Sequence, residues 1–169
     1  MLEVIIAILT ITAFLTGTLQ LMAVNALYKV RAERQAKANF WIQEDFEYVK
    51  ALASSLEVKS SPNYVKTDVC TGTEGYATAL RRQLTETTLP NTSIPTEKLV
   101  ETRAIVGKKN YSLHRTFDIT GQSANPHRLS INYRVEATDK NSKDYPNQEN
   151  VIAESSVEVI PDASFKCPS

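Results

Sequence analysis

The sequence has few of the residues that build chemical sites. Its 169 residues include two histidines and two cysteines, all far apart along the chain, whereas zinc sites need several such ligands at short spacing. It contains no Gly-x-Ser-x-Gly elbow, no His-Glu-x-x-His helix and no Cys-x-x-Cys pair. Gly72 and Gly75 are not followed by the Gly-Lys-Ser/Thr of a phosphate loop. We therefore predict no catalytic residue, no metal ligand and no cofactor.

The chain also has no excess of charge of either sign. It has 19 basic and 19 acidic side chains and a sequence pI near 6.7, so no overall field favours nucleic acid or an acidic substrate. With 42% apolar residues, its length suits one membrane segment and one modest globular domain of roughly 110 residues. No nucleic-acid partner and no second globular domain are expected.

Charge is absent altogether from Val4 to Tyr28. At a helical rise of about 1.5 Å per residue this run reaches about 37 Å, which is enough to cross a hydrocarbon core of about 30 Å. It is too long for the apolar part of a cleaved secretory signal, and no small-residue cleavage site follows it. We predict that residues 1–28 are the transmembrane half of one long helix that ends near Leu56, with membrane lipid as a partner.

One acid, Glu3, stands at the start of this apolar run, where a charge drawn into hydrocarbon costs several kcal/mol unless it is offset. The run Leu2-Glu3-Val4-Ile5-Ile6-Ala7-Ile8-Leu9-Thr10-Ile11 resembles the N-terminal signature of type IV pilins and of the pseudopilins of type II secretion. The resemblance implies that Glu3 pairs with the N-terminal amine of a neighbouring subunit during filament assembly. The alternative is that Glu3 lies in the head-group region without a role.

The resemblance also implies partners and processing. The partners would be other pilin or pseudopilin subunits, an inner-membrane assembly platform and the prepilin peptidase. The mature, methylated N-terminus would lie two residues before Met1.

Gly17, between Thr16 and Thr18, is the predicted weak point of the helix. Glycine is about 1 kcal/mol less favourable than alanine inside a helix, and threonine is stiff at χ1. In the family, the middle of this helix commonly melts when subunits pack. The alternative is that Gly17 is a small residue that allows close helix packing in lipid.

A basic cluster follows the apolar run: Lys29, Arg31, Arg34 and Lys37. The positive-inside rule applied to this cluster alone would keep the rest of the chain in the cytoplasm. A basic leader upstream would reverse this topology, and we favour that interpretation. The expected location is then a single pass through the inner membrane with the head outside the cytoplasm, followed by a filament in the periplasm or at the cell surface. Glu33 is spaced for an i,i+4 ion pair with Lys37.

Residues 29–58 are predicted to be the amphipathic half of the same helix. Apolar side chains recur at steps of three and four, at Ile42, Phe46, Val49, Ala53 and Leu56. Acidic and basic side chains fall mostly off this stripe and are expected to be solvated: Glu44, Asp45, Glu47 and Lys50. Trp41 and Tyr48 flank the stripe as core or interface residues. Pro62 ends the helical pattern.

The rest of the chain, residues 59–169, is predicted to be a globular head. After a possible short helix at Tyr76–Leu84, the apolar period becomes two, which indicates four strands. The first runs from Leu99 to Val106, and the others are marked by Tyr111, Leu113, Phe117 and Ile119; by Leu129, Ile131, Tyr133, Val135 and Ala137; and by Val151, Ala153, Val157 and Val159. Turns at 107–110, 121–126 and 139–150 make an antiparallel meander.

The fold class is therefore α+β, with the amphipathic half of the helix as the only large apolar stripe available to cover the sheet. This arrangement matches the pilin-like fold that the resemblance implies. His114, at a polar position of its strand, and His127, in a loop after Pro126, are expected at the surface.

The 139–149 loop is rich in oxygen ligands, which raises a calcium hypothesis. It fits the EF-hand pattern badly, because Asp144 stands where that pattern needs Gly and Asn150 where it needs Glu. A solvated loop is the better interpretation.

Cys70 and Cys167 bracket the predicted sheet. In a small exported domain, two widely separated cysteines favour a disulfide over a metal site. The family resemblance adds support, because many pilins have a disulfide that holds their C-terminal region. Two unpaired thiols in a cytoplasmic domain are the alternative.

We expect a minor pilin or pseudopilin whose function is filament assembly rather than catalysis. The alternative is a single-pass anchored domain that binds a partner and does not polymerise.

Overall fold

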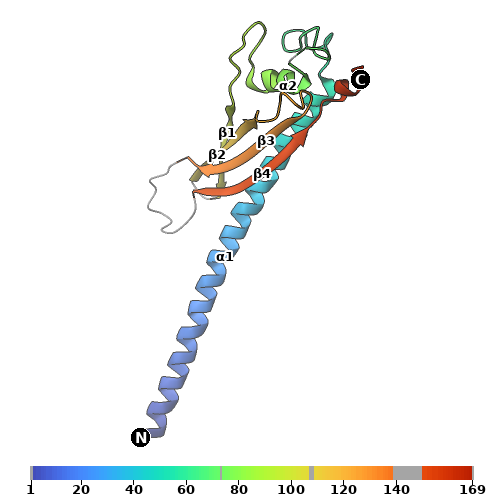
Figure 1. The fold of residues 1–169 in the computed structure, drawn as a ribbon. Helices are drawn as coiled ribbons and strands as arrows, with labels where there is room; N and C mark the ends of the chain where they lie inside the picture. The colour runs from blue at the N-terminus through green and yellow to red at the C-terminus, as the bar shows by residue number, and fades with distance from the viewer. Residues whose placement is uncertain (1, 73, 107–108, 139–149, 169) are drawn as a thin grey trace. The chain divides into compact units, whose positions relative to one another are not determined.

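The computed structural model describes residues 2–72, 74–106, 109–138 and 150–168. Within these residues, two α-helices, four strands and one 3-10 helix follow in the order α1 (Leu2–Ser55), α2 (Tyr76–Thr85), β1 (Glu97–Val106), β2 (Lys109–Asp118), β3 (Leu129–Ala137), β4 (Val151–Val159) and η1 (Asp162–Lys166) (Figure 1). The chain divides into two compact units, residues 1–37 and 38–169.

The first unit consists of the N-terminal part of α1. The helix is unbroken through Gly17, and none of residues 2–28 is buried. The predicted i,i+4 pair forms, since Lys37 Nζ lies 2.8 Å from Glu33 Oε1. The hydrogen bond from Lys37 and its charge lower the pKa of the Glu33 carboxyl.

In the second unit the strands form one antiparallel sheet in the order β1-β2-β3-β4, which confirms the predicted meander. Ile131 of β3 lies opposite Phe117 of β2 and Val157 of β4. The three therefore line one face of the sheet. Ile119 is an exception to the predicted alternation, because β2 ends at Asp118 and Ile119 is exposed.

The core of this unit lies between the sheet and the helices. Four of the five predicted stripe residues are buried in it, Ile42, Val49 and Ala53 of α1 and Leu56 just after the helix, whereas Phe46 is only partly buried. Ala38 and Trp41 of α1 are buried as well. The expectation that α1 alone covers the sheet was wrong, because α2 buries five further core residues: Tyr76, Ala77, Ala79, Leu80 and Leu84. The short helix carries few large apolar side chains, so its stripe is inconspicuous in the sequence.

Two of the predicted turns lie in part or whole outside the described residues. The first predicted turn, 107–110, includes residues 107–108, which are outside the described residues; Val106 and Lys109 on either side are opposite each other in the register of β1 and β2. The loop at 139–149, with its calcium hypothesis, is also outside the described residues.

Candidate functional site

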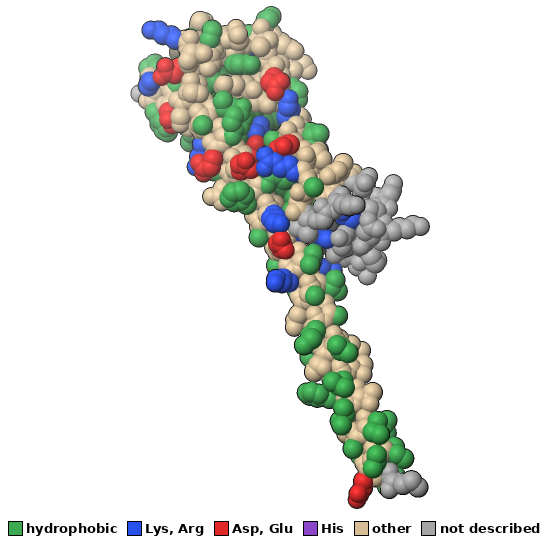
Figure 2. All heavy atoms as spheres, turned by 180° about the vertical axis from the view of Figure 1, so that it is seen from behind, with side chains coloured by type: hydrophobic (Ala, Val, Ile, Leu, Met, Phe, Trp, Pro, Cys, Tyr) green, Lys and Arg blue, Asp and Glu red, His purple; other side chains and the backbone are tan. Residues whose placement is uncertain are grey.

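The apolar side chains of the N-terminal unit are exposed along its length. Phe14, for example, exposes 73% of its surface. Figure 2 shows hydrophobic side chains covering this part of the helix. Among the described residues, α1 is the one helix long and apolar enough to span a membrane, and its most apolar stretch has no buried residue. Residues 2–28 are therefore a candidate membrane anchor.

The threonines of this segment satisfy their hydroxyl groups within the helix. Thr12 donates to Ile8 O at 2.6 Å and Thr16 to Thr12 O at 2.7 Å, and Thr10 and Thr18 make similar bonds. An unpaired hydroxyl costs free energy in an apolar medium, where water cannot replace the bond. The hydroxyls therefore do not oppose insertion into hydrocarbon.

Glu3 lies in the first turn of α1, and its side chain is exposed. Within the part of the chain that the structure describes, it makes no ion pair. The partial positive charge of a helix N-terminus stabilises a nearby carboxylate by about 0.3–1 kcal/mol. This stabilisation is smaller than the cost of moving the charge into hydrocarbon, so a cation close to Glu3 would stabilise the carboxylate further in such a medium.

Gly17 makes no close contact that requires a glycine. A Cβ atom built at this position meets no atom within 4 Å. Packing within the subunit therefore does not explain the residue. Both sequence interpretations, a weak point and a close-packing position, concern contacts with other molecules.

In the head, one buried ion pair joins α1 to β2. Arg115 Nε donates to Asp45 Oδ2 at 2.7 Å, and Arg115 Nη2 donates to Asp45 Oδ1. The prediction that Asp45 lies on a solvated face was wrong, since Asp45 is 8% exposed and Arg115 4%. The pairing partner explains the burial, because a carboxylate can leave water when a guanidinium offers two hydrogen bonds.

This pair changes the acid–base behaviour of its surroundings. Burial lowers the pKa of Arg115, but the hydrogen bonds and the charge of Asp45 outweigh it and raise the pKa overall. Burial, followed by the negative charge of Asp45, raises the pKa of the Tyr133 hydroxyl. Arg115 therefore stays charged and Tyr133 neutral over the physiological range.

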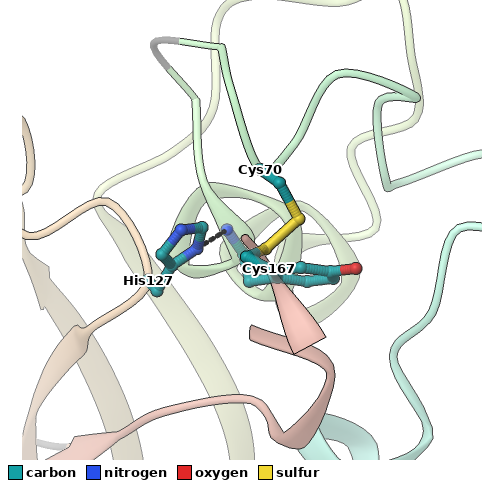
Figure 3. Close-up of a disulfide and its surroundings, with 4 residues drawn as sticks. Cys70, His127 and Cys167 are labelled. Atoms are coloured by element: carbon teal, nitrogen blue, oxygen red, sulfur yellow. Dashed lines mark hydrogen bonds between the residues drawn. A yellow bond between two sulfur atoms is a disulfide. The ribbon is translucent and has the colours of Figure 1, made fainter. Parts of the chain in front are cut away.

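A disulfide closes the other end of the head. It joins Cys70 to Cys167, with 5.3 Å between the Cα atoms (Figure 3). Nearby, Lys166 Nζ lies 2.6 Å from Glu57 Oε1. The C-terminal segment is thus fixed covalently to the loop that precedes α2 and electrostatically to the segment that follows α1.

His127 lies in the β2–β3 loop, as predicted, but its side chain is half-buried against this region rather than at the surface. Its Nδ1 accepts a hydrogen bond from the backbone N–H of Tyr76 at 3.2 Å (Figure 3), and Pro126 O accepts one from Ala77 N at 3.1 Å. The β2–β3 loop thereby binds the free N–H groups at the start of α2. Gly75 permits the approach, because a Cβ there would lie 2.1 Å from Pro126 O.

His114 also differs from its predicted surface position, since its side chain is 20% exposed. Its Nδ1 lies 3.3 Å from Glu97 Oε1 and its Nε2 3.8 Å from Glu136 Oε1. The strand parity placed the side chain on the polar face correctly. It could not show that neighbouring strands would supply two acids around it.

No protein-family model, curated protein or solved structure matches this chain.

The head offers little for small-molecule chemistry in its described part. No group of three or more His, Cys, Asp or Glu side chains there could hold a metal ion. The feature that demands a partner is the apolar surface of residues 2–28, because water in contact with so many exposed side chains is unfavourable.

Proposed function

We propose that this chain is a membrane-anchored subunit of a filament, a minor pilin or pseudopilin of the type IV pilus or type II secretion kind. The observation that carries the proposal is a continuous helix with two kinds of surface. Its first part is apolar on all sides, with one acid in the first turn, and its last part is buried against a sheet.

The apolar part suits two environments in turn, lipid before assembly and the helices of other subunits afterwards. In lipid, Glu3 stays short of a counter-charge. A neighbouring subunit that brings a cationic N-terminal amine supplies that charge, so pairing favours docking. The head is then a rigid unit that presents its surface outside the helix bundle.

The disulfide supports export of the head. Disulfides persist in oxidising compartments and are rare in the cytoplasm, and Cys70 and Cys167 are joined. We propose a single pass through the inner membrane with the head outside the cytoplasm. Lys29 and the bases after it then lie at the outer head groups.

The test is Glu3→Gln, which keeps the shape of the side chain and removes its charge. In the native cells, the variant should insert into the membrane as the original protein does, and its incorporation into sheared filament fractions should fall at least about ten-fold, as the loss of one charge pair in a dry environment implies. Glu33→Gln is the matched control, since Glu33 is a solvated acid of the same helix.

Unchanged incorporation of the Glu3→Gln variant would refute the docking role of the acid. If the original protein never enters a filament fraction, the proposed function is wrong, and an anchored binding domain takes its place. An intact mass measured without reductant adds a second check. A mature N-terminus two residues before Met1 with one added methyl group is expected.

A further inference from the structure

The two edge strands of the sheet, β1 and β4, differ in how they are protected. β1 has two register shifts against β2, between Leu99 and Glu101 and between Ala104 and Val106. It also carries Arg103 on the side of the sheet that packs against α1. Bulges and inward-pointing charges keep an edge strand from pairing with other chains. β1 is therefore a protected edge.

β4 has neither kind of protection over most of its length. From Ala153 to Val159 it pairs with β3 without a register shift, and its core-facing positions carry no charge: Ala153, Ser155, Val157 and Val159. Among the described residues, no backbone hydrogen bond extends from this stretch on the side away from β3. Its free N–H and C=O groups form a template for an added strand.

A trough on the outward face of the sheet leads to this edge. Thr116, Asn132 and Ser156 are register partners across β2, β3 and β4, so their short polar side chains form one row. An open hollow of about 420 Å³ lies over the row, and Arg134 and Glu154 line one of its sides. A strand added beside β4 would place one side chain next to Ser156, at the mouth of the trough.

The charge around the trough favours a base at that position. The strands place five carboxylates on this face: Glu97, Asp118, Glu136, Glu154 and Glu158. The bases are two arginines, Arg134 of β3 and Arg128 in the loop before β3. Glu154 is exposed and makes no ion pair with any described residue. Glu158 accepts a hydrogen bond from Ser130 Oγ at 3.3 Å, and its one ion pair with a described residue is long, at 3.5 Å from Arg128.

The same charges disfavour a second copy of β4 as the added strand. Antiparallel pairing about a two-fold axis at Ser156 would bring Glu154 of one copy opposite Glu158 of the other. Like charges directly opposite each other in a sheet are destabilising. In this register the charges therefore favour an occupant with a different sequence.

We propose that β4 binds an extended segment of a partner protein as a fifth strand, and that this segment places a lysine or arginine next to Ser156. The backbone of the segment pairs with Ala153–Val159. Its basic side chain lies along the trough over Ser156 and Asn132 and pairs with Glu154. This inference does not rest on filament assembly, because the edge and the trough belong to the head alone.

The test uses the full chain in detergent micelles and a fluorescein-labelled nine-residue peptide of alternating Thr and Val with Lys at its centre. Fluorescence anisotropy should show saturable binding, and hydrogen exchange should slow at the amides of Ala153–Val159. A peptide with Glu in place of Lys should bind at least about ten-fold more weakly, because it meets carboxylates instead of pairing with them. Ser156→Arg, which puts a base into the trough at an exposed position, should abolish the preference for Lys.

Glu154→Gln should weaken binding of the Lys peptide about five-fold, as expected for a partly exposed ion pair. Glu47→Gln, a solvated acid on α1, is the matched control and should change nothing. Equal binding of the Lys and Glu peptides would overturn the charge selection. No binding, or protection outside β4, would overturn the site. Protection of β4 in the peptide-free protein that is lost on dilution would instead show that a second copy occupies the edge.

Discussion

Asp45 and Arg115 offer the sharpest test of how α1 is held to the sheet. Asp45→Asn keeps the size and shape of the side chain but removes its charge. The guanidinium of Arg115, 4% exposed, then remains buried without a counter-ion. Breaking a buried pair in this way costs about 3–5 kcal/mol. That is a large part of a typical domain stability of about 5–15 kcal/mol.

The neighbouring residue provides the comparison. Glu44 pairs with Arg103 at 2.8 Å, also between α1 and the sheet, but the two side chains are 51% and 43% exposed. An exposed pair contributes about 0.2–1 kcal/mol. Glu44→Gln should therefore cost several-fold less than Asp45→Asn, although the two acids are adjacent in the sequence.

Urea unfolding in micelles, followed by tryptophan fluorescence, measures both costs. The chain has one tryptophan, Trp41, which is 4% exposed in the head core. The double variant Asp45→Leu/Arg115→Met, which replaces the pair by apolar groups, should recover most of the stability lost in Asp45→Asn. Equal costs for Asp45→Asn and Glu44→Gln would refute the argument from burial.

Three further predictions follow from other parts of the chain. Reduction of the Cys70–Cys167 disulfide, whose cysteines are 97 residues apart, should lower the free energy of unfolding by up to about 4.7 kcal/mol; a Cys70→Ser/Cys167→Ser variant should show the same loss, and its urea midpoint should not respond to reductant. The hydrogen bond from Arg82 lowers the pKa of Glu74 from its ordinary value of 4.5. The ionised Glu74 carboxylate therefore stabilises the fold above that pH, and this stabilisation is lost as the pH falls through the lowered pKa. The Glu74→Gln variant should lose less stability between about pH 5 and 2 than the original protein, and an identical loss would contradict this account. Gly17→Ala should stabilise the helix by about 1 kcal/mol, because the added methyl group meets no neighbour; hydrogen exchange around residue 17 in micelles should slow, whereas faster exchange would mean that the position is strained.

The long helix and the meander could be predicted because their signals are local. Apolar positions repeat every three to four residues along α1 and every two along the strands, and each pattern depends only on backbone geometry. The ends of the elements were also close, with α1 ending at Ser55 against a predicted Leu56. Such periodicity tells which face is buried but not which residues from other elements lie opposite.

Apart from Ile119, the wrong predictions all concerned contacts between distant segments. Asp45 falls off the apolar stripe, and only its partner explains why it is buried. A signal for that partner existed, because Arg115 stands between Leu113 and Phe117 at a core-facing strand position, where a charge requires an opposite one. For His127 the sequence signal was Gly75, because a glycine at the start of a helix can allow another segment to approach closely, and here the β2–β3 loop does so.

The disulfide can form only late in the synthesis of the chain. Cys167 follows Cys70 by 97 residues, and the whole sheet lies between them. At a synthesis rate of about 5–20 residues per second, roughly 5–20 s pass after Cys70 is made before its partner exists. During that interval the emerging head has no covalent closure, so chaperones and proteases encounter it as an open chain. The last residues of the head thus decide when that exposure ends.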